Sequence, residues 1–101
     1  MLPEKLVRDR IPEIIRQKGG DPQIRIATGT ELDKLIRHKV AEEAQELLIS
    51  GEDEEIADVL EALDALIEHR AMNRATIEEA RLKKRLERGG FEKGFVLEMQ
   101  D

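Results

Sequence analysis

The chain has 101 residues, a net charge of −6 and no cysteine. These values fit one small domain spanning residues 1–101, exclude a disulfide framework or a thiolate zinc site, and argue against a nucleic-acid or anionic-membrane surface, which needs basic patches. No apolar run approaches the roughly 20 residues that cross a membrane, and the N-terminus lacks the apolar run of a signal peptide, so we expect a cytoplasmic protein.

The core has to be aliphatic, because aromatic residues make up only 2% of the chain. A short chain buries a smaller fraction of its surface on folding than a long chain does, and small proteins often enlarge their core by self-association. Charged residues make up 40% of the sequence, a level typical of long helices that face solvent.

Residues 1–20 contain a short basic opening followed by a compact helix signal. Pro12 suits the first turn of that helix, and the glycines at 19–20 end it. Residues 24–26 then alternate between apolar and polar side chains, as a short strand would.

Two long helices follow. The first is predicted from about Glu31 to Ile49, with Thr30 as its N-cap, and Ser50-Gly51 closes it. The second is predicted from Glu52 or Asp53 to Ala71, with acidic residues in its first turn, where the helix dipole favours them. The two helices should therefore form an antiparallel hairpin.

A third helix is predicted over about Ile77–Arg88, capped by Thr76 and ended by the glycines at 89–90. Residues 95–98 form a second candidate strand, which could pair with the first over one end of the helices. The predicted fold class is all-α, an antiparallel helical bundle with room for this short two-stranded element near the termini.

Several carboxylates occupy positions where helical spacing calls for core residues. Glu43 lies within the apolar stripe of the first long helix and Glu46 lies at its inner edge, while Glu55 and Asp58 share a face of the second. In an antiparallel hairpin, the two residue numbers of each opposed pair add up to the same value. The pairs Glu46–Glu55 and Glu43–Asp58 give the same sum. One register therefore brings all four carboxylates together.

Clustered carboxylates repel one another and are costly to desolvate without a partner. The partner that fits is a hard divalent cation, Mg²⁺ with Mn²⁺ as a substitute, and Mg²⁺ usually shares its coordination sphere with substrate phosphates. A di-iron site is set aside because the Glu-x-x-His motif is missing. The alternative is that these are surface acids neutralised by neighbouring lysines and arginines.

Three sequence blocks carry a family resemblance. The acidic pattern EExxE at 42–46 followed by ExxD at 55–58, the opening KLVRDRIPEII at 5–15 and the closing ERGGF at 87–91 resemble the MazG-like all-α nucleotide pyrophosphohydrolases. They are most similar to the small, single-domain branch called phosphoribosyl-ATP pyrophosphohydrolase-like. The resemblance spans nearly the whole chain.

The resemblance implies a helical bundle that assembles as a homodimer or a dimer of dimers. It implies Mg²⁺-dependent cleavage of a nucleoside triphosphate into a monophosphate and pyrophosphate, which would clear non-standard or surplus nucleotides. It also implies the roles of individual residues. The metal ligands would be Glu43, Glu46, Glu55 and Asp58, the accessory acid that orients or activates water Glu42, and the phosphate-binding residues Lys39, Lys84 and Arg88.

Alternatives remain for these roles and for the function. The alternative for Lys39 is a pairing with acidic residues of its own helix, and the alternative for Lys84 and Arg88 is to complement a helix C-terminus. Arg8 and Asp9 are expected to join the N-terminal segment to the bundle. The chain could instead be a phosphoribosyl-ATP pyrophosphohydrolase of histidine biosynthesis, or a non-catalytic helical interaction module with a vestigial acidic site.

Overall fold

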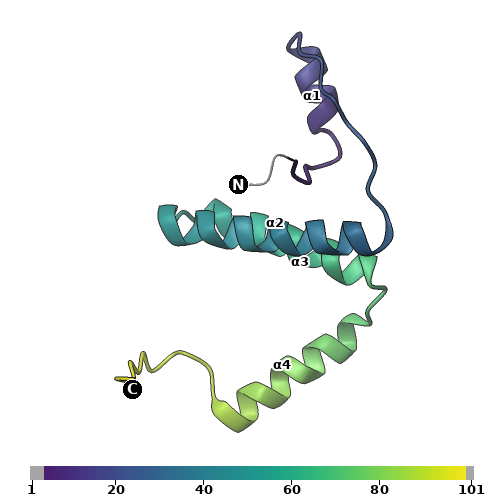
Figure 1. The fold of residues 1–101 in the computed structure, drawn as a ribbon. Helices are drawn as coiled ribbons and strands as arrows, with labels where there is room; N and C mark the ends of the chain where they lie inside the picture. Colours follow the sequence, from purple (N-terminus) through teal and green to yellow (C-terminus); the bar gives the residue numbers. More distant parts are fainter. Residues whose placement is uncertain (1–3, 100–101) are drawn as a thin grey trace. The chain divides into compact units, whose positions relative to one another are not determined.

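In a computed structural model that describes residues 4–99, the protein consists of four helices and no strand (Figure 1). The helices are α1 (Ile11–Gln17), α2 (Gly29–Ser50), α3 (Asp53–His69) and α4 (Arg74–Arg88). The chain divides into two compact units, Met1–Ala71 and Met72–Asp101. The all-α class is thus confirmed, while the single domain over residues 1–101 stays a prediction.

The first unit is organised around the α2–α3 hairpin, as predicted. Gly51 ends α2 in a left-handed conformation with φ of 66°, which glycine adopts without strain, and its N–H donates to the carbonyl of Leu47 at 2.8 Å. The Ser50 hydroxyl accepts the N–H of Glu52 at 3.1 Å. This tight turn lets α3 fold back along α2, and the two helices lie side by side (Figure 1).

The packing between these helices buries little surface. Ile36 on α2 is 4% exposed and Ala62 on α3 is 6% exposed, and no other residue in the range 4–99 is buried. Ile36 lies seven residues before Glu43 on the same face of α2. Ala62 lies four residues after Asp58, on the face of α3 that also carries Glu55. A core this small makes the remaining apolar surface of the hairpin available for other contacts.

Polar contacts join α2 and α3 at the end of the hairpin opposite the turn. Arg70, just after α3, donates to both carboxylate oxygens of Asp33 on α2, at 2.7 and 3.1 Å. The Nε2 nitrogen of His69 lies 3.0 Å from the carbonyl oxygen of Gly29, so it donates to that carbonyl. These contacts hold the end of α3 against the start of α2. The acidic residues lie toward the other end of the hairpin, near the turn.

Helix α1 and the segment after it complete the first unit. Proline stands in the first turn of α1, as predicted, and the helix ends at Gln17, before Gly19 with its φ of 89°. Arg25 joins the connecting segment to the rest of the unit through paired hydrogen bonds to Glu4 and Glu31.

The second unit contains α4 and the residues after it. The Asn73 side chain accepts the N–H of Ala75 at 2.8 Å, and Gly89 closes the helix with its N–H on the carbonyl of Arg85 at 2.7 Å. Arg85 also forms an ion pair with Glu92.

Two kinds of prediction were wrong. Neither 24–26 nor 95–98 is a strand, and both segments expose their apolar side chains; a ladder of three or four residues offers few hydrogen bonds, so such a pair is marginal. The N-caps are Thr28 and Asn73, and not Thr30 and Thr76, because the helices begin earlier than the apolar periodicity indicates. None of the helices in the range 4–99 is long and apolar enough to span a membrane.

Candidate metal centre

The hairpin brings three of the predicted carboxylates together. Glu43 on α2 and Glu55 and Asp58 on α3 each offer one oxygen, and these oxygens all lie within 4.8 Å of one another. All three side chains are half-buried. The register with equal sums predicted this grouping, because opposed positions of a short antiparallel hairpin must face each other. We call these three residues the carboxylate cluster.

Glu46, the fourth predicted ligand, is not one of these three. It is exposed on α2, yet it lies close enough to Glu55 for its charge to act on that carboxyl. The register therefore places Glu46 at the edge of the cluster. Glu52, Asp53 and Glu54, which were expected to face solvent, are all exposed.

The cluster is electrostatically unfavourable by itself. The pKa of Glu55 is raised, first because its carboxyl is desolvated and then because Asp58, Glu46 and Glu43 repel its negative charge. A hydrogen bond between Glu55 and Asp58 raises the pKa further, since two carboxyl groups can share such a bond only through a proton. These effects prevail over the favourable position of Glu55 in the first turn of α3.

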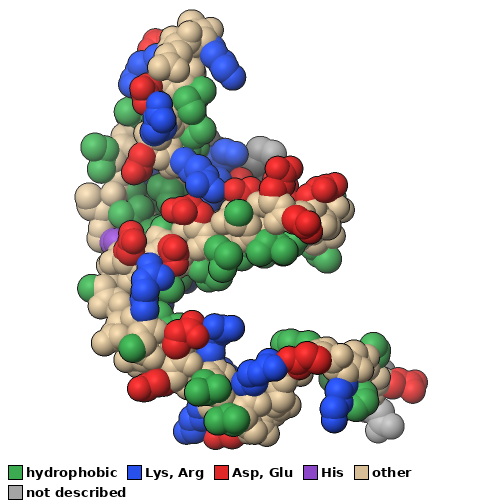
Figure 2. All heavy atoms as spheres, turned by 180° about the vertical axis from the view of Figure 1, so that it is seen from behind, with side chains coloured by type: hydrophobic (Ala, Val, Ile, Leu, Met, Phe, Trp, Pro, Cys, Tyr) green, Lys and Arg blue, Asp and Glu red, His purple; other side chains and the backbone are tan. Residues whose placement is uncertain are grey.

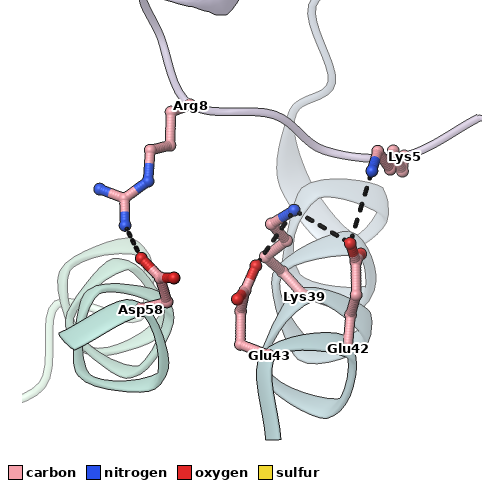
Figure 3. A network of polar contacts seen from close by, with 6 residues as sticks. All are labelled: Lys5, Arg8, Lys39, Glu42, Glu43 and Asp58. Carbon is pink, nitrogen blue, oxygen red and sulfur yellow. Dashed lines mark hydrogen bonds and ion pairs between the residues drawn. The ribbon is translucent and has the colours of Figure 1, made fainter. Parts of the chain in front are cut away.

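Lys39 supplies a positive charge from within α2. Its Nζ lies 3.4 Å from Oε1 of Glu42 and 3.5 Å from Oε1 of Glu43, and its side chain is only 19% exposed (Figure 3). Lys39 therefore does pair with acids of its own helix. From the sequence alone, this pairing was the alternative to a phosphate-binding role. The phosphate-binding role of Lys39 stays a prediction.

The N-terminal segment contributes two further cations that the sequence did not place at the site. The Nη2 nitrogen of Arg8 donates to Oδ1 of Asp58 at 2.7 Å, and Nζ of Lys5 lies 3.5 Å from Oε1 of Glu42 (Figure 3). Arg8 does join this segment to the hairpin, as expected, but it does so through a member of the carboxylate cluster. The only signal was the basic character of the opening KLVR.

The charges around the cluster can be compared directly. Five carboxylates face three cations, and these groups are Glu42, Glu43, Glu46, Glu55 and Asp58 with Lys5, Arg8 and Lys39. With all five carboxylates ionised, two negative charges remain, which is the charge that one divalent cation would neutralise. The cluster consists entirely of carboxylate oxygens, the ligand type that Mg²⁺ and Mn²⁺ prefer. The residues present thus fit a hard divalent cation.

Lys84 and Arg88, the other predicted phosphate-binding residues, belong to α4 in the second unit. They are exposed and lie one helical turn apart near the end of that helix. Their substrate-binding role stays a prediction.

Comparison with known proteins found no matching family model, no matching curated protein and no matching solved structure.

Proposed function

We propose that the protein is a Mg²⁺-dependent nucleoside triphosphate pyrophosphohydrolase. The observation that carries this proposal is the carboxylate cluster, in which two helices bring the oxygens of Glu43, Glu55 and Asp58 within 4.8 Å of one another. Such an arrangement is unfavourable without a cation, and Mg²⁺ held by a few carboxylates usually shares its coordination sphere with phosphates. The resemblance of the acidic pattern to the MazG-like pyrophosphohydrolases narrows the phosphate substrate to a nucleoside triphosphate.

The roles of the residues follow from their positions. Glu43, Glu55 and Asp58 would hold Mg²⁺, with Glu46 at the edge of the same site. When bound, the cation neutralises phosphate oxygens and makes phosphorus more susceptible to attack. Lys39, beside Glu43, would stabilise negative charge that develops on the phosphates.

Glu42 is the residue proposed to activate water. Both of its lysine contacts, from Lys5 and Lys39, are made by Oε1, so Oε2 is the oxygen that would accept a proton. Water would form a bond to phosphorus, the bond between the α and β phosphates would break, and the proton of the water would pass to Glu42. The products are a nucleoside monophosphate and pyrophosphate.

The test is a nucleotide panel with Mg²⁺, scored for release of pyrophosphate against orthophosphate. The wild-type protein is expected to release pyrophosphate, and Glu43→Gln and Asp58→Asn are expected to abolish the release while the far-ultraviolet circular dichroism stays helical. Glu54→Gln, an exposed acid of the same hairpin, is the matched control and should retain activity. Full turnover in both cluster variants would refute the assignment of the metal site.

A second candidate function is favoured by the ion pairs themselves. Arg8 and Lys39 already neutralise part of the cluster, as they would in a helical interaction module whose acidic site is vestigial. Such a module would show no hydrolysis, and its melting temperature would be indifferent to Mg²⁺ and nucleotide. A rise in melting temperature with Mg²⁺ would therefore exclude this alternative.

We also propose that the chain forms a homo-oligomer, a homodimer or a dimer of dimers. Ile56, Leu60 and Leu63 share one face of α3, and each is between 38% and 58% exposed. Figure 2 shows hydrophobic side chains gathered along one side of the helix pair. Light scattering should report a multiple of the 11.5 kDa chain mass, and Leu60→Glu should lower it. A monomer at micromolar concentration would contradict this proposal.

A further inference from the structure

The N-terminal segment crosses the turn-end half of the hairpin beside the carboxylate cluster. Lys5 reaches Glu42 on α2, and Arg8 reaches Asp58 on α3, so the two cations contact different helices on either side of the site (Figure 3). The segment is not helical at these residues, and the half-buried Leu6 lies between the two cations. Its basic side chains are therefore held at the site by a non-helical stretch of chain.

The contact made by Arg8 leaves most of its hydrogen-bonding capacity unused. A guanidinium group has five N–H donors, and the bond to Asp58 uses one nitrogen, Nη2. The side chain remains 56% exposed, so its other donors are accessible to a ligand. Its fork geometry suits phosphate oxygens as well as it suits a carboxylate.

The bond also makes Arg8 a competitor for a metal ligand. Oδ1 of Asp58 cannot give its full negative charge to a cation while it accepts a bond from Arg8 at 2.7 Å. Metal binding at the cluster would weaken this ion pair, and the released guanidinium would then lie beside the site with no negative partner of its own. A phosphate chain bound at the metal would provide that partner.

From this geometry we infer that Arg8 is a substrate-binding residue that contacts the phosphates of the bound triphosphate, with Lys5 as a second cation from the same segment. The inference rests on the proposed function. In the structure Arg8 donates to Asp58, and with metal and substrate bound it would donate to the phosphates instead. The N-terminal segment is thus part of the site and not only a structural connection.

The experiment measures two affinities by titration calorimetry, for Mn²⁺ alone and for inorganic triphosphate saturated with Mg²⁺. Inorganic triphosphate is used because its binding does not depend on a base. Arg8→Gln is compared with the wild type, with Arg8→Lys and with Arg10→Gln. Arg10→Gln is the matched control, because it removes the same charge two residues away. The Arg10 side chain pairs locally with Glu13 at 3.2 Å and not with the cluster.

Arg8→Gln is expected to weaken triphosphate binding about tenfold to hundredfold, the usual effect of losing a hydrogen bond to a charged group. The same variant is expected to bind Mn²⁺ alone up to about fivefold more tightly, because an exposed ion pair no longer competes for Asp58. Arg8→Lys should lie between Arg8→Gln and the wild type in triphosphate affinity. Arg10→Gln should match the wild type in both measurements.

Two outcomes would overturn the inference alone. One is a triphosphate affinity of Arg8→Gln equal to that of the wild type. The other is an equal weakening of Mn²⁺ and triphosphate binding with a lowered melting temperature, which would make Arg8 purely structural. If the wild type binds neither Mn²⁺ nor triphosphate, the proposed function fails and the inference fails with it.

Discussion

Replacing Glu55 with glutamine separates the electrostatic cost of the carboxylate cluster from its capacity to bind a metal ion. The pKa of Glu55 is raised by desolvation and by Asp58, Glu46 and Glu43, so the folded protein holds a proton that the unfolded chain releases at a lower pH. Stability therefore falls as the pH rises above the ordinary value of 4.5 and through the raised value. The cost is complete once the pH lies above both values, and at any pH above the ordinary value Glu55→Gln should melt at a higher temperature than the wild type in EDTA.

The same substitution should remove most of the stabilisation that Mg²⁺ provides. At a concentration 100 times its dissociation constant, a ligand stabilises the folded state by about 2.7 kcal/mol, or roughly 10 to 20 °C in melting temperature for a domain of this size. Loss of a carboxylate ligand should weaken binding by at least about 100-fold, the upper range for residues that only support metal ligands. The remaining stabilisation is then about 0.4 kcal/mol, or roughly 2 to 3 °C.

The assay is thermal melting followed by circular dichroism at pH 7, with EDTA or with Mg²⁺. Glu54→Gln is the control, because it removes the same charge from the neighbouring position of α3 without touching the cluster. It should melt slightly lower than the wild type in EDTA, since acids in a first helical turn are favourable, and it should keep the full response to Mg²⁺. Either of two results would refute the role assigned to Glu55: a melting temperature of Glu55→Gln below that of the wild type in EDTA, or a response of this variant to Mg²⁺ equal to that of Glu54→Gln.

Two further predictions concern the hairpin that carries the site. Hydrogen bonds from Arg70 and then Arg37 lower the pKa of Asp33 from 3.8 to about 2, so the stability they confer is present above about pH 4 and is lost as the pH falls toward 2. Arg70→Gln should move the midpoint of acid unfolding, followed by circular dichroism, to a higher pH. Arg81→Gln is the control and should not move it, because its partner Glu78 lies on the same helix. Equal midpoints in the two variants would contradict this prediction. Ile36→Ala should lower the free energy of unfolding in urea by about 2 to 5 kcal/mol, because it leaves a cavity between α2 and α3. Ile26→Ala, at a side chain that is 87% exposed, should change it by less than about 0.5 kcal/mol, and similar losses in both variants would disprove the assignment of Ile36 to the core.

The carboxylate cluster could be predicted from the sequence because helical geometry is regular. Each residue of a helix turns by 100°, and the short connection at Ser50-Gly51 leaves few registers for two helices to pack. Glu43 and Asp58 therefore had to face each other once the hairpin was recognised. The bounds of α2 and α3 differ from the prediction by no more than two residues at each end, as is usual for helix termini.

The predictions outside the hairpin were less accurate. The sequence suggested short strands at 24–26 and 95–98, but a strand also needs a neighbour to pair with, and local sequence does not specify one. The start of α4 was predicted three residues late because Asn73, which caps it, precedes the first apolar residue of the periodic pattern.

By itself, the sequence determined the all-α class, the helical hairpin and the convergence of Glu43, Glu55 and Asp58. These features depend on the spacing of residues within regular helices, which the chain carries locally. Only the tertiary structure placed Arg8 and Lys5 beside the cluster, because their position depends on how a non-helical segment returns over the hairpin, 50 residues away from Asp58 along the chain. No periodic pattern encodes such a path, since it is decided by the contacts that the folded chain makes.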